Sequence, residues 1–302
     1  MAFLVVGESL VDLISRGGSW SFDAKPGGSP LNVAVGLVAD GHEARFATEI
    51  GGDLFGGLLR EHLDTYGVAP TDIAVTEAPT SVAFARIDEV GGATYDFRFG
   101  WAYQGKPALD GVTCLHTGSL ATAVPPGADA VLELISAARA AGTLVSYDPN
   151  IRPALVGDRA DALARVEEIV RTADIVKVSD EDLRWLLPGE PDVEVARRWA
   201  GFGPKLVVVT RGGSGAVGVH DGQVVECAAP KITVADTVGA GDAFTAGLLS
   251  ALSRAGAFST DSVGRAMRYA VATAAAVCAR PGALPPPRAE IAALLEALDS
   301  PA

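Results

Sequence analysis

The chain has 302 residues, of which 49% are hydrophobic and 20% charged, and 24 basic against 37 acidic side chains give a formal net charge of −13. This composition is typical of a globular protein with a sizeable core, and the length leaves one large domain or two domains open. The acidic balance argues against a protein that neutralises nucleic-acid phosphates, because that affinity needs clustered Lys and Arg.

Nothing in the chain predicts export or membrane insertion. The first 13 residues reach Glu8 and Asp12 before an apolar signal region is complete, so they are expected to form a first strand. The longest apolar run, 270–279, is too short to span a bilayer. Three widely spaced cysteines form no Cys-x-x-Cys pair: Cys114, Cys227 and Cys278. They fit neither a disulfide framework nor a zinc site, which favours a cytoplasmic protein.

Short apolar runs alternate with helical patterns along most of the chain, which is typical of parallel strands joined by crossover helices. The expected strands are 2–7, 111–118, 143–150, 174–179 and 205–210. The expected helices are 29–41, 125–142 and 158–174. The first helix is expected to have Ser29 as its N-cap, Pro30 at its first position and Gly41 at its end. We therefore expect a doubly wound α/β fold.

Two stretches interrupt this alternation. Residues 13–28 and 80–103 alternate apolar and polar side chains around glycine pairs, which is typical of hairpins. We expect them to form one small sheet over the carboxyl ends of the parallel strands, where open α/β sheets bind ligands. A flap without a chemical role and a dimer contact are equally open alternatives. Residues 1–302 are then expected to form a single domain with this sheet as its lid.

The most informative segment is 234–252, in which Gly239, Ala240 and Gly241 lead into an amphipathic helix. A helix N-terminus presents unpaired amides and a partial positive charge, so this turn predicts a phosphate site. Asp242 follows directly and fits a general base that takes a proton from an alcohol attacking a phosphoryl group. An acidic residue that only stabilises the helix dipole is the alternative.

A second segment places Asn32 one turn into an otherwise apolar helix that follows Gly27 and Gly28. The Asn32 amide can donate and accept hydrogen bonds, which suits the recognition of sugar hydroxyls. Satisfying a buried carbonyl is the alternative. Residues 213–218 carry the glycine spacing of a dinucleotide fingerprint, but the following segment predicts a hairpin and not a helix, so we do not expect NAD binding.

Together, the two segments resemble the paired signatures of the ribokinase-like, or PfkB, family of carbohydrate kinases. The matching residues are Gly27, Gly28, Asn32 and Ala34 in the first signature and Asp236, Thr237, Gly239, Ala240, Gly241, Asp242 and Phe244 in the second. The resemblance extends over nearly the whole chain through residues 7–13, 146–155, 176–183 and 207–216. It implies a ribokinase-like, mostly parallel sheet flanked by helices, with a small β-sheet lid.

The resemblance also implies a kinase that uses ATP with Mg²⁺ and transfers the γ-phosphate to a sugar hydroxyl. Asp242 is then the catalytic base, and Gly239, Ala240 and Gly241 form the anion hole. The implied sugar-binding residues are Asp12, Gly27, Gly28, Asn32, Arg98 and Arg152. The implied nucleotide-binding residues are Ser179, Thr210, Gly212 and Gly215. Asp236 matches a ligand of a monovalent cation, for which potassium is the candidate.

One element departs from the family pattern. The family's Asn-x-x-Glu element, tied to magnesium and phosphate handling, is replaced here by residues 179–182, Ser-Asp-Glu-Asp. Ser179 supplies a hydroxyl in place of an amide. Magnesium handling is therefore expected at Glu181 or Asp182, and the choice between them stays open.

The expected sugar is fructose, because the first strand, residues 146–152 and Arg98 are most similar to the fructokinase branch. A 2-keto-3-deoxygluconate kinase is the alternative, since Arg98 and Arg152 could hold a carboxylate, and a ribokinase is a further one. From a different class, the chain could be a catalytically silent sugar or nucleotide sensor. We expect sugar and ATP as partners and a homodimer formed through the lid.

Overall fold

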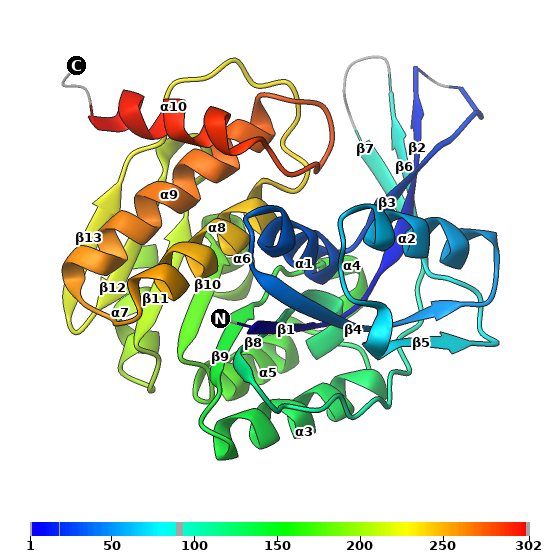
Figure 1. The fold of residues 1–302 in the computed structure, drawn as a ribbon, viewed down its shortest axis with the longest axis horizontal. Coiled ribbons are helices and arrows are strands. Elements are labelled where there is room, and N and C mark those ends of the chain that lie inside the picture. Colours follow the sequence, from blue (N-terminus) through cyan, green and yellow to red (C-terminus); the bar gives the residue numbers. More distant parts are fainter. Residues whose placement is uncertain (1, 18, 89–92, 300–302) are drawn as a thin grey trace.

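The computed structural model describes residues 2–17, 19–88 and 93–299, and its main feature is a nine-stranded sheet in the order β13-β12-β11-β10-β9-β8-β1-β4-β5 (Figure 1). Its strands are β1 (Ala2–Val6), β4 (Glu43–Gly51), β5 (Ile73–Thr76), β8 (Val112–Gly118), β9 (Leu144–Asp148), β10 (Ile175–Ser179), β11 (Leu206–Thr210), β12 (Ala216–His220) and β13 (Gln223–Cys227). All pairs are parallel except the two that involve β12, at one edge. The five expected strands and the mostly parallel α/β class are confirmed.

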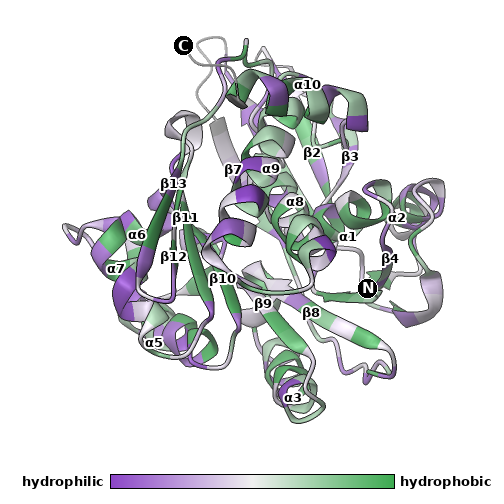
Figure 2. Ribbon diagram, turned by 60° about the vertical axis from the view of Figure 1, so that its left-hand side comes forward, coloured by the Kyte–Doolittle hydropathy of each residue, from purple (hydrophilic) through white to green (hydrophobic). Residues whose placement is uncertain are grey.

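Helices cover both faces of this sheet. One face packs against α3 (Gly127–Ala140), α5 (Arg159–Val170), α6 (Asp180–Leu186) and α7 (Asp192–Ala200). The other face packs against α1 (Ser29–Ala39), α2 (Leu54–Thr65), α8 (Ala240–Ala255) and α9 (Thr260–Cys278). Along β1, Leu4 points into the first core and Phe3 and Val5 into the second, as alternating side chains of a strand must. Strands buried on both faces therefore need the continuous apolar runs seen in green in Figure 2.

Shorter elements complete the large layer. The last helix, α10 (Arg288–Asp299), packs on α9. One short helix, α4 (Pro153–Val156), follows β9. The 3₁₀ turns are η1 (Pro70–Asp72), η2 (Ser119–Thr122) and η3 (Gly212–Ser214).

A separate four-stranded sheet has the order β3-β2-β6-β7. Its strands are β2 (Leu10–Arg16), β3 (Asp23–Gly27), β6 (Val82–Ile87) and β7 (Ala93–Arg98). The parallel pairing of β2 with β6 joins the two interrupting stretches, which confirms that they form one small sheet. Figure 1 shows its far end projecting at the upper right, while β2 and β3 contact α2. Gly18, from the first expected glycine pair, and residues 89–92, which include the second pair, lie outside the described residues.

Two local expectations differ from the structure, and two strands were not expected. Ser29 is not an N-cap; Gly28 caps α1, and the Ser29 hydroxyl instead donates to Asp242, so the side chain is used in a tertiary contact. Strands β4 and β5 were not predicted. The small sheet begins at Leu10 and not at 13, because β2 follows β1 after a break of only a few residues and the Val11 amide already bonds to the Ser81 carbonyl.

The expected hairpin after β11 is confirmed. Asp221 and Gly222, between β12 and β13, have φ of 47° and 72°, as a tight two-residue hairpin turn requires. A helix does not follow the glycines of 213–218, which agrees with the rejection of a dinucleotide fingerprint there.

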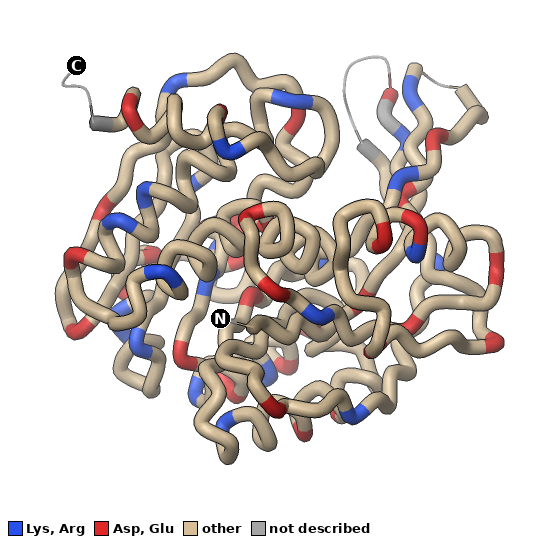
Figure 3. The backbone as a smooth tube through the Cα atoms, viewed as in Figure 1, with Lys and Arg blue, Asp and Glu red and all other residues tan. Residues whose placement is uncertain are grey.

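Charges of both signs are distributed over the described part of the chain. Lys and Arg are interspersed with Asp and Glu along the chain (Figure 3). Of the helices in the described ranges, none has the length and apolar character needed to cross a membrane.

The order of the strands fixes where a ligand can bind. From β1 the chain continues to β4 on one side, while β8 to β11 lie on the other side. The order therefore reverses between β1 and β8, and the carboxyl ends of strands at such a switch point form the usual ligand-binding crevice of an open α/β sheet. The small sheet begins at this edge, because β2 follows the carboxyl end of β1.

Candidate active site

The glycine-rich turn leads directly into α8. Gly239 is the residue that caps this helix and has a φ of 77°, a left-handed conformation that favours glycine. Within the described ranges, the amides of Gly239, Gly241 and Asp242 have no hydrogen-bond acceptor in the protein, whereas the Ala240 amide donates to the Thr237 carbonyl at 3.2 Å. The open amides are therefore those of the turn's two glycines and of the aspartate that follows, and this geometry disfavours Ala240 as an anion-hole donor.

The Asp242 carboxylate is buried and held by the first turn of α1. Ser29 Oγ donates to Asp242 Oδ1 at 2.6 Å, and Asn32 Nδ2 donates to Oδ2 at 2.8 Å. Burial raises the pKa of Asp242, and these two hydrogen bonds act against that rise. Each carboxylate oxygen has a second lone pair for a substrate hydroxyl. A residue that only stabilised a helix dipole would not need these tertiary contacts.

The expected sugar-binding aspartate lies close to this carboxylate. Burial raises the pKa of Asp12 to about 6; Arg152 lowers this value and Asp242 raises it further. A Cβ added at Gly27 would lie 2.2 Å from Asp12 Oδ2, so glycine is needed for the aspartate to lie against the end of β3. The structure thus brings Asp12, Arg152 and Asp242 into one electrostatic neighbourhood.

The two predicted arginines occupy different environments. Arg152 is exposed at the start of α4 and donates to Asn150 Oδ1 at 2.8 Å. Arg98, 66% exposed on β7, instead pairs with Asp96 at 2.7 Å. Within the described residues the structure gives Arg98 no contact with the other expected sugar-binding residues.

The expected nucleotide-binding residues lie at the carboxyl ends of adjacent strands. Ser179 of β10 and Thr210 of β11 are paired in register. Gly212 lies in η3, and Gly215, with a φ of 94°, begins the return to β12. The Ser179 hydroxyl accepts a hydrogen bond from the Asp182 amide at 2.9 Å and so also caps α6.

The three expected metal ligands are already engaged or exposed. The oxygens of Asp182 accept the amides of Ile151 and Ser179, while Glu181 is exposed. The oxygens of Asp236 accept the amides of Val238 and Gly282 and so tie the turn before α8 to the segment after α9. In the part of the chain that the structure describes, no three His, Cys, Asp or Glu side chains gather as a metal site would require.

Three buried ionisable side chains near the site were not predicted as site residues. Lys177 Nζ donates to Asp148 Oδ2 at 2.9 Å, and both side chains are almost fully buried. Glu8, after β1, is buried and accepts the Ala121 amide at 2.9 Å. A single lysine inside the apolar run 174–179, and an acidic residue directly after the first strand, are the sequence signals that could have pointed to them.

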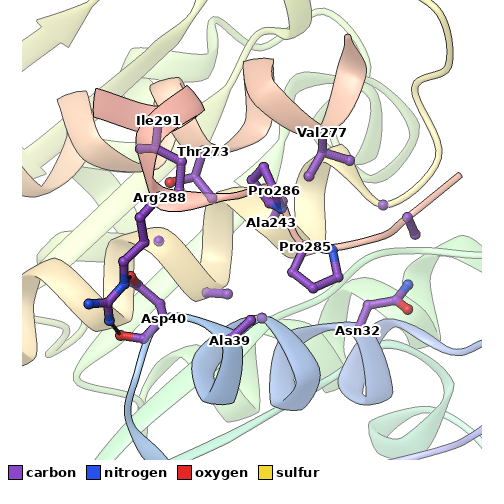
Figure 4. Close-up of a pocket in the computed structure, with 15 residues that line it drawn as sticks. Asn32, Ala39, Asp40, Ala243, Thr273, Val277, Pro285, Pro286, Arg288 and Ile291 are labelled. Atoms are coloured by element: carbon purple, nitrogen blue, oxygen red, sulfur yellow. Dashed lines mark hydrogen bonds and ion pairs between the residues drawn. The ribbon is translucent and has the colours of Figure 1, made fainter. Parts of the chain in front are cut away.

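A small cavity adjoins the site between α1, α8, α9 and the segment that leads to α10 (Figure 4). Asn32 lies at one end and the ion pair of Asp40 with Arg288 at the other. Its volume of about 30 Å³ suffices for one or two water molecules and not for a sugar or a nucleotide.

Comparison with known proteins finds carbohydrate kinases both among family models and among individual relatives. The model of the pfkB family carbohydrate kinases matches residues 3–289. A fructokinase from Rhizobium leguminosarum bv. trifolii is 36% identical over 261 residues, which cover 82% of this chain and 79% of that protein.

Solved structures align over almost the full length. A fructokinase double mutant from Vibrio cholerae O395, in a form with fructose, ADP and potassium ion bound, has a TM-score of 0.86 at 28% identity and covers 97% of this chain and 98% of its own. A fructokinase with bound ATP from Xylella fastidiosa has a TM-score of 0.88 at 26% identity and covers 99% of both chains.

Glu8 gives a prediction for stability. Burial raises its pKa from 4.5 to about 7, so the native state binds more protons than the unfolded chain between these values. The free energy of unfolding should therefore fall as pH rises through this range, by about 3 kcal/mol for this group. Glu8→Gln keeps an acceptor for the Ala121 amide and should remove this part of the pH dependence in urea unfolding. Glu133→Gln, at an exposed position of α3, is the control. Equal slopes for Glu8→Gln and the unmodified chain would contradict the assignment.

Proposed function

The chain belongs to the pfkB family of carbohydrate kinases, and we propose that it transfers the γ-phosphate of ATP to a hydroxyl of fructose. The observation that carries the proposal is the buried carboxylate of Asp242, held by Ser29 and Asn32 directly beside open amides at the start of α8. Similarity to fructokinases, including one with fructose and ADP bound, supports the choice of sugar.

The geometry fits direct transfer. A sugar hydroxyl donates to Asp242, whose carboxylate takes its proton as the oxygen attacks the γ-phosphorus. The bond from that phosphorus to the bridging oxygen of ADP breaks, and ADP leaves with the electron pair. The amides of Gly239, Gly241 and Asp242 stabilise charge on the transferring group. Positioning and charge neutralisation, without a covalent intermediate, then supply most of the rate enhancement.

Charges around the site favour a neutral sugar over a sugar acid. Asp12 lies near Asp242, and Arg152 interacts with both Asp12 and Glu8. Its positive charge is thus already partly neutralised, so a substrate carboxylate would meet more negative than positive charge. We assign Asp12 and Asn32 to the sugar hydroxyls, with Gly27 and Gly28 allowing close approach. Arg98 contributes only if the lid moves toward the site.

The nucleotide is assigned to the carboxyl ends of β10 and β11, with contacts from Ser179, Thr210, Gly212 and Gly215. Mg²⁺ neutralises phosphate charge when bound. It would be held chiefly by the nucleotide, because the described side chains form no three-ligand cluster. Glu181 is the freer of the two candidate carboxylates, since the oxygens of Asp182 accept backbone amides. Asp236 is assigned to a potassium ion beside the turn.

We further propose that residues 1–302 act as one cytoplasmic domain, in which the small sheet closes over the sugar and pairs two copies of the chain. All three cysteines are free, as in a reducing compartment. Trp20, between β2 and β3, is 77% exposed, and Tyr95 of β7 is 60% exposed. Such large apolar side chains at the surface fit a protein contact.

The base assignment predicts a specific loss in Asp242→Asn. The amide cannot accept the proton, so kcat should fall by about 10² to 10⁴-fold, while calorimetric affinity for ATP and fructose changes little. Asp129→Asn, at an exposed site on α3, is the matched control. An unchanged kcat in Asp242→Asn would remove the base assignment.

The sugar is tested by phosphorylation rates on a panel. We expect fructose to give the highest kcat/KM among fructose, ribose, 2-keto-3-deoxygluconate and nucleosides, because the site accepts a neutral polyol. A preference for 2-keto-3-deoxygluconate would instead assign Arg152 to a substrate carboxylate. Binding without turnover of any compound would identify a sensor.

The lid contact predicts the oligomeric state. Light scattering coupled to size-exclusion chromatography should give a dimer for the unmodified chain and a monomer for Trp20→Glu, because a carboxylate in an apolar contact is costly. Val75→Glu, at a 57% exposed site on β5, should remain dimeric. A monomeric unmodified chain would refute the contact.

A further inference from the structure

Lys177 is an unusual residue for its place in the fold. It lies in β10, a central strand whose other residues are apolar apart from the terminal Ser179, and only 5% of it is exposed. Burying an ammonium group is expensive unless it is paired. Its partner is Asp148 at the end of β9, and Asp148 Oδ2 accepts the hydrogen bond from Lys177 Nζ at 2.9 Å.

The pair lies against the first turn of α8. A Cβ added at Gly241 would come within 3.1 Å of Lys177 Nζ, so the ammonium is next to the glycine turn. Thr245, one turn further along α8, has its Oγ1 3.1 Å from the Gly241 carbonyl oxygen and 3.4 Å from Asp148 Oδ2. The pair is therefore joined to the same helical turn that carries the open amides and Asp242.

The charges around the pair are mainly negative. Three buried carboxylates act on Lys177: Asp148, Asp182 of α6 and Asp242 of α8. Asp148 Oδ1 is buried and has no hydrogen-bond partner among the residues that the structure describes, so Lys177 provides the main compensation for this carboxylate. One ammonium group thus faces more than one buried negative charge.

Among the residues that the structure describes, the other elements around Asp242 supply no second cation in direct contact. α1 offers the neutral Ser29 and Asn32. β2 offers Asp12, another acid, which Arg152 partly balances. α9 approaches α8 through Ala270 and Thr273, both near Gly247. Among the charged groups that act on Asp242, Asp148 opposes its ionisation and Lys177 favours it.

We propose that Lys177 is a positioning residue for phosphoryl transfer: anchored by Asp148 under the glycine turn, it keeps Asp242 ionised and supports the turn whose amides receive the phosphoryl group. This inference rests on the proposed kinase function. The inference assigns Lys177 and Asp148 opposite effects on the ionisation of Asp242. Loss of Lys177 leaves like charges facing each other, whereas loss of the Asp148 charge leaves the ammonium free to act on Asp242.

The test is the pH dependence of kcat/KM for fructose, whose acidic limb reports the pKa of the base in the free enzyme. In Lys177→Met this limb should shift to higher pH by about one unit or more. At pH values on the limb kcat/KM then falls about tenfold, and it recovers at alkaline pH. In Asp148→Asn the limb should shift to lower pH. Lys177→Arg keeps the charge and should restore the position of the limb.

A purely structural role predicts a different result. In that case Lys177→Met lowers kcat/KM by the same factor at every pH, and the limb stays in place, which would overturn the inference. Because Lys177→Met leaves a buried carboxylate unpaired, the double variant Lys177→Met with Asp148→Asn removes both charges and keeps the test available if the single variant does not fold. Its acidic limb should return toward that of the unmodified chain, and a limb displaced as far as in Lys177→Met alone would count against the proposal.

A second measurement separates this inference from the proposed function. The infrared difference spectrum between the chain with Asp242 and its Asp242→Asn variant isolates the signal of this carboxyl group. Recorded over a range of pH without substrate, it gives the midpoint of protonation. The midpoint should be higher in the Lys177→Met background and lower in the Asp148→Asn background, and equal midpoints would refute the inference. Shifted midpoints in a chain that phosphorylates no sugar would uphold the electrostatic role of the pair and refute only the proposed function.

Discussion

The structure depends on how the Asp242 carboxylate is held beside the open amides that begin α8. Open amides at the start of α8 attract negative charge, and Asp242 lies in the same turn. Its position is fixed by Ser29 and Asn32, which approach from α1, more than 200 residues away in sequence. The two helix N-termini therefore form one unit, in which α8 supplies open amides and the carboxylate and α1 holds that carboxylate in place.

The sheet places this unit where its strand order reverses, between β1 and β8, which is where open α/β sheets usually bind ligands. Glu8, Asp148 and Lys177 all lie at the carboxyl-end edge of the sheet or just below it. The small sheet starts from the same edge and so places Asp12 near Asp242. The fold thus gathers residues from both halves of the chain around one carboxylate.

Much of this was predictable from the sequence, for identifiable reasons. Buried parallel strands are continuous apolar runs, and the glycine turn with its aspartate is a local pattern. β4 was missed because Glu43, Arg45 and Glu49 interrupt its apolar residues; Arg45 is tolerated there because it pairs with Asp72. The pairing of Lys177 with Asp148 joins residues 29 positions apart and depends on strand order.

Two further expectations depend on local geometry. The engagement of the Ala240 amide depends on how the turn folds back on Thr237, which residue types do not specify. Arg98 was expected at the sugar, yet its closest charged partner is Asp96 on its own strand. The most direct measurement is a crystal structure with fructose, ADP and an aluminium fluoride mimic of the transferring phosphoryl group. The account predicts the mimic on the amides of Gly239, Gly241 and Asp242, with a fructose hydroxyl hydrogen-bonded to the Asp242 carboxylate. A mimic bound away from these amides, or a hydroxyl directed away from Asp242, would contradict it.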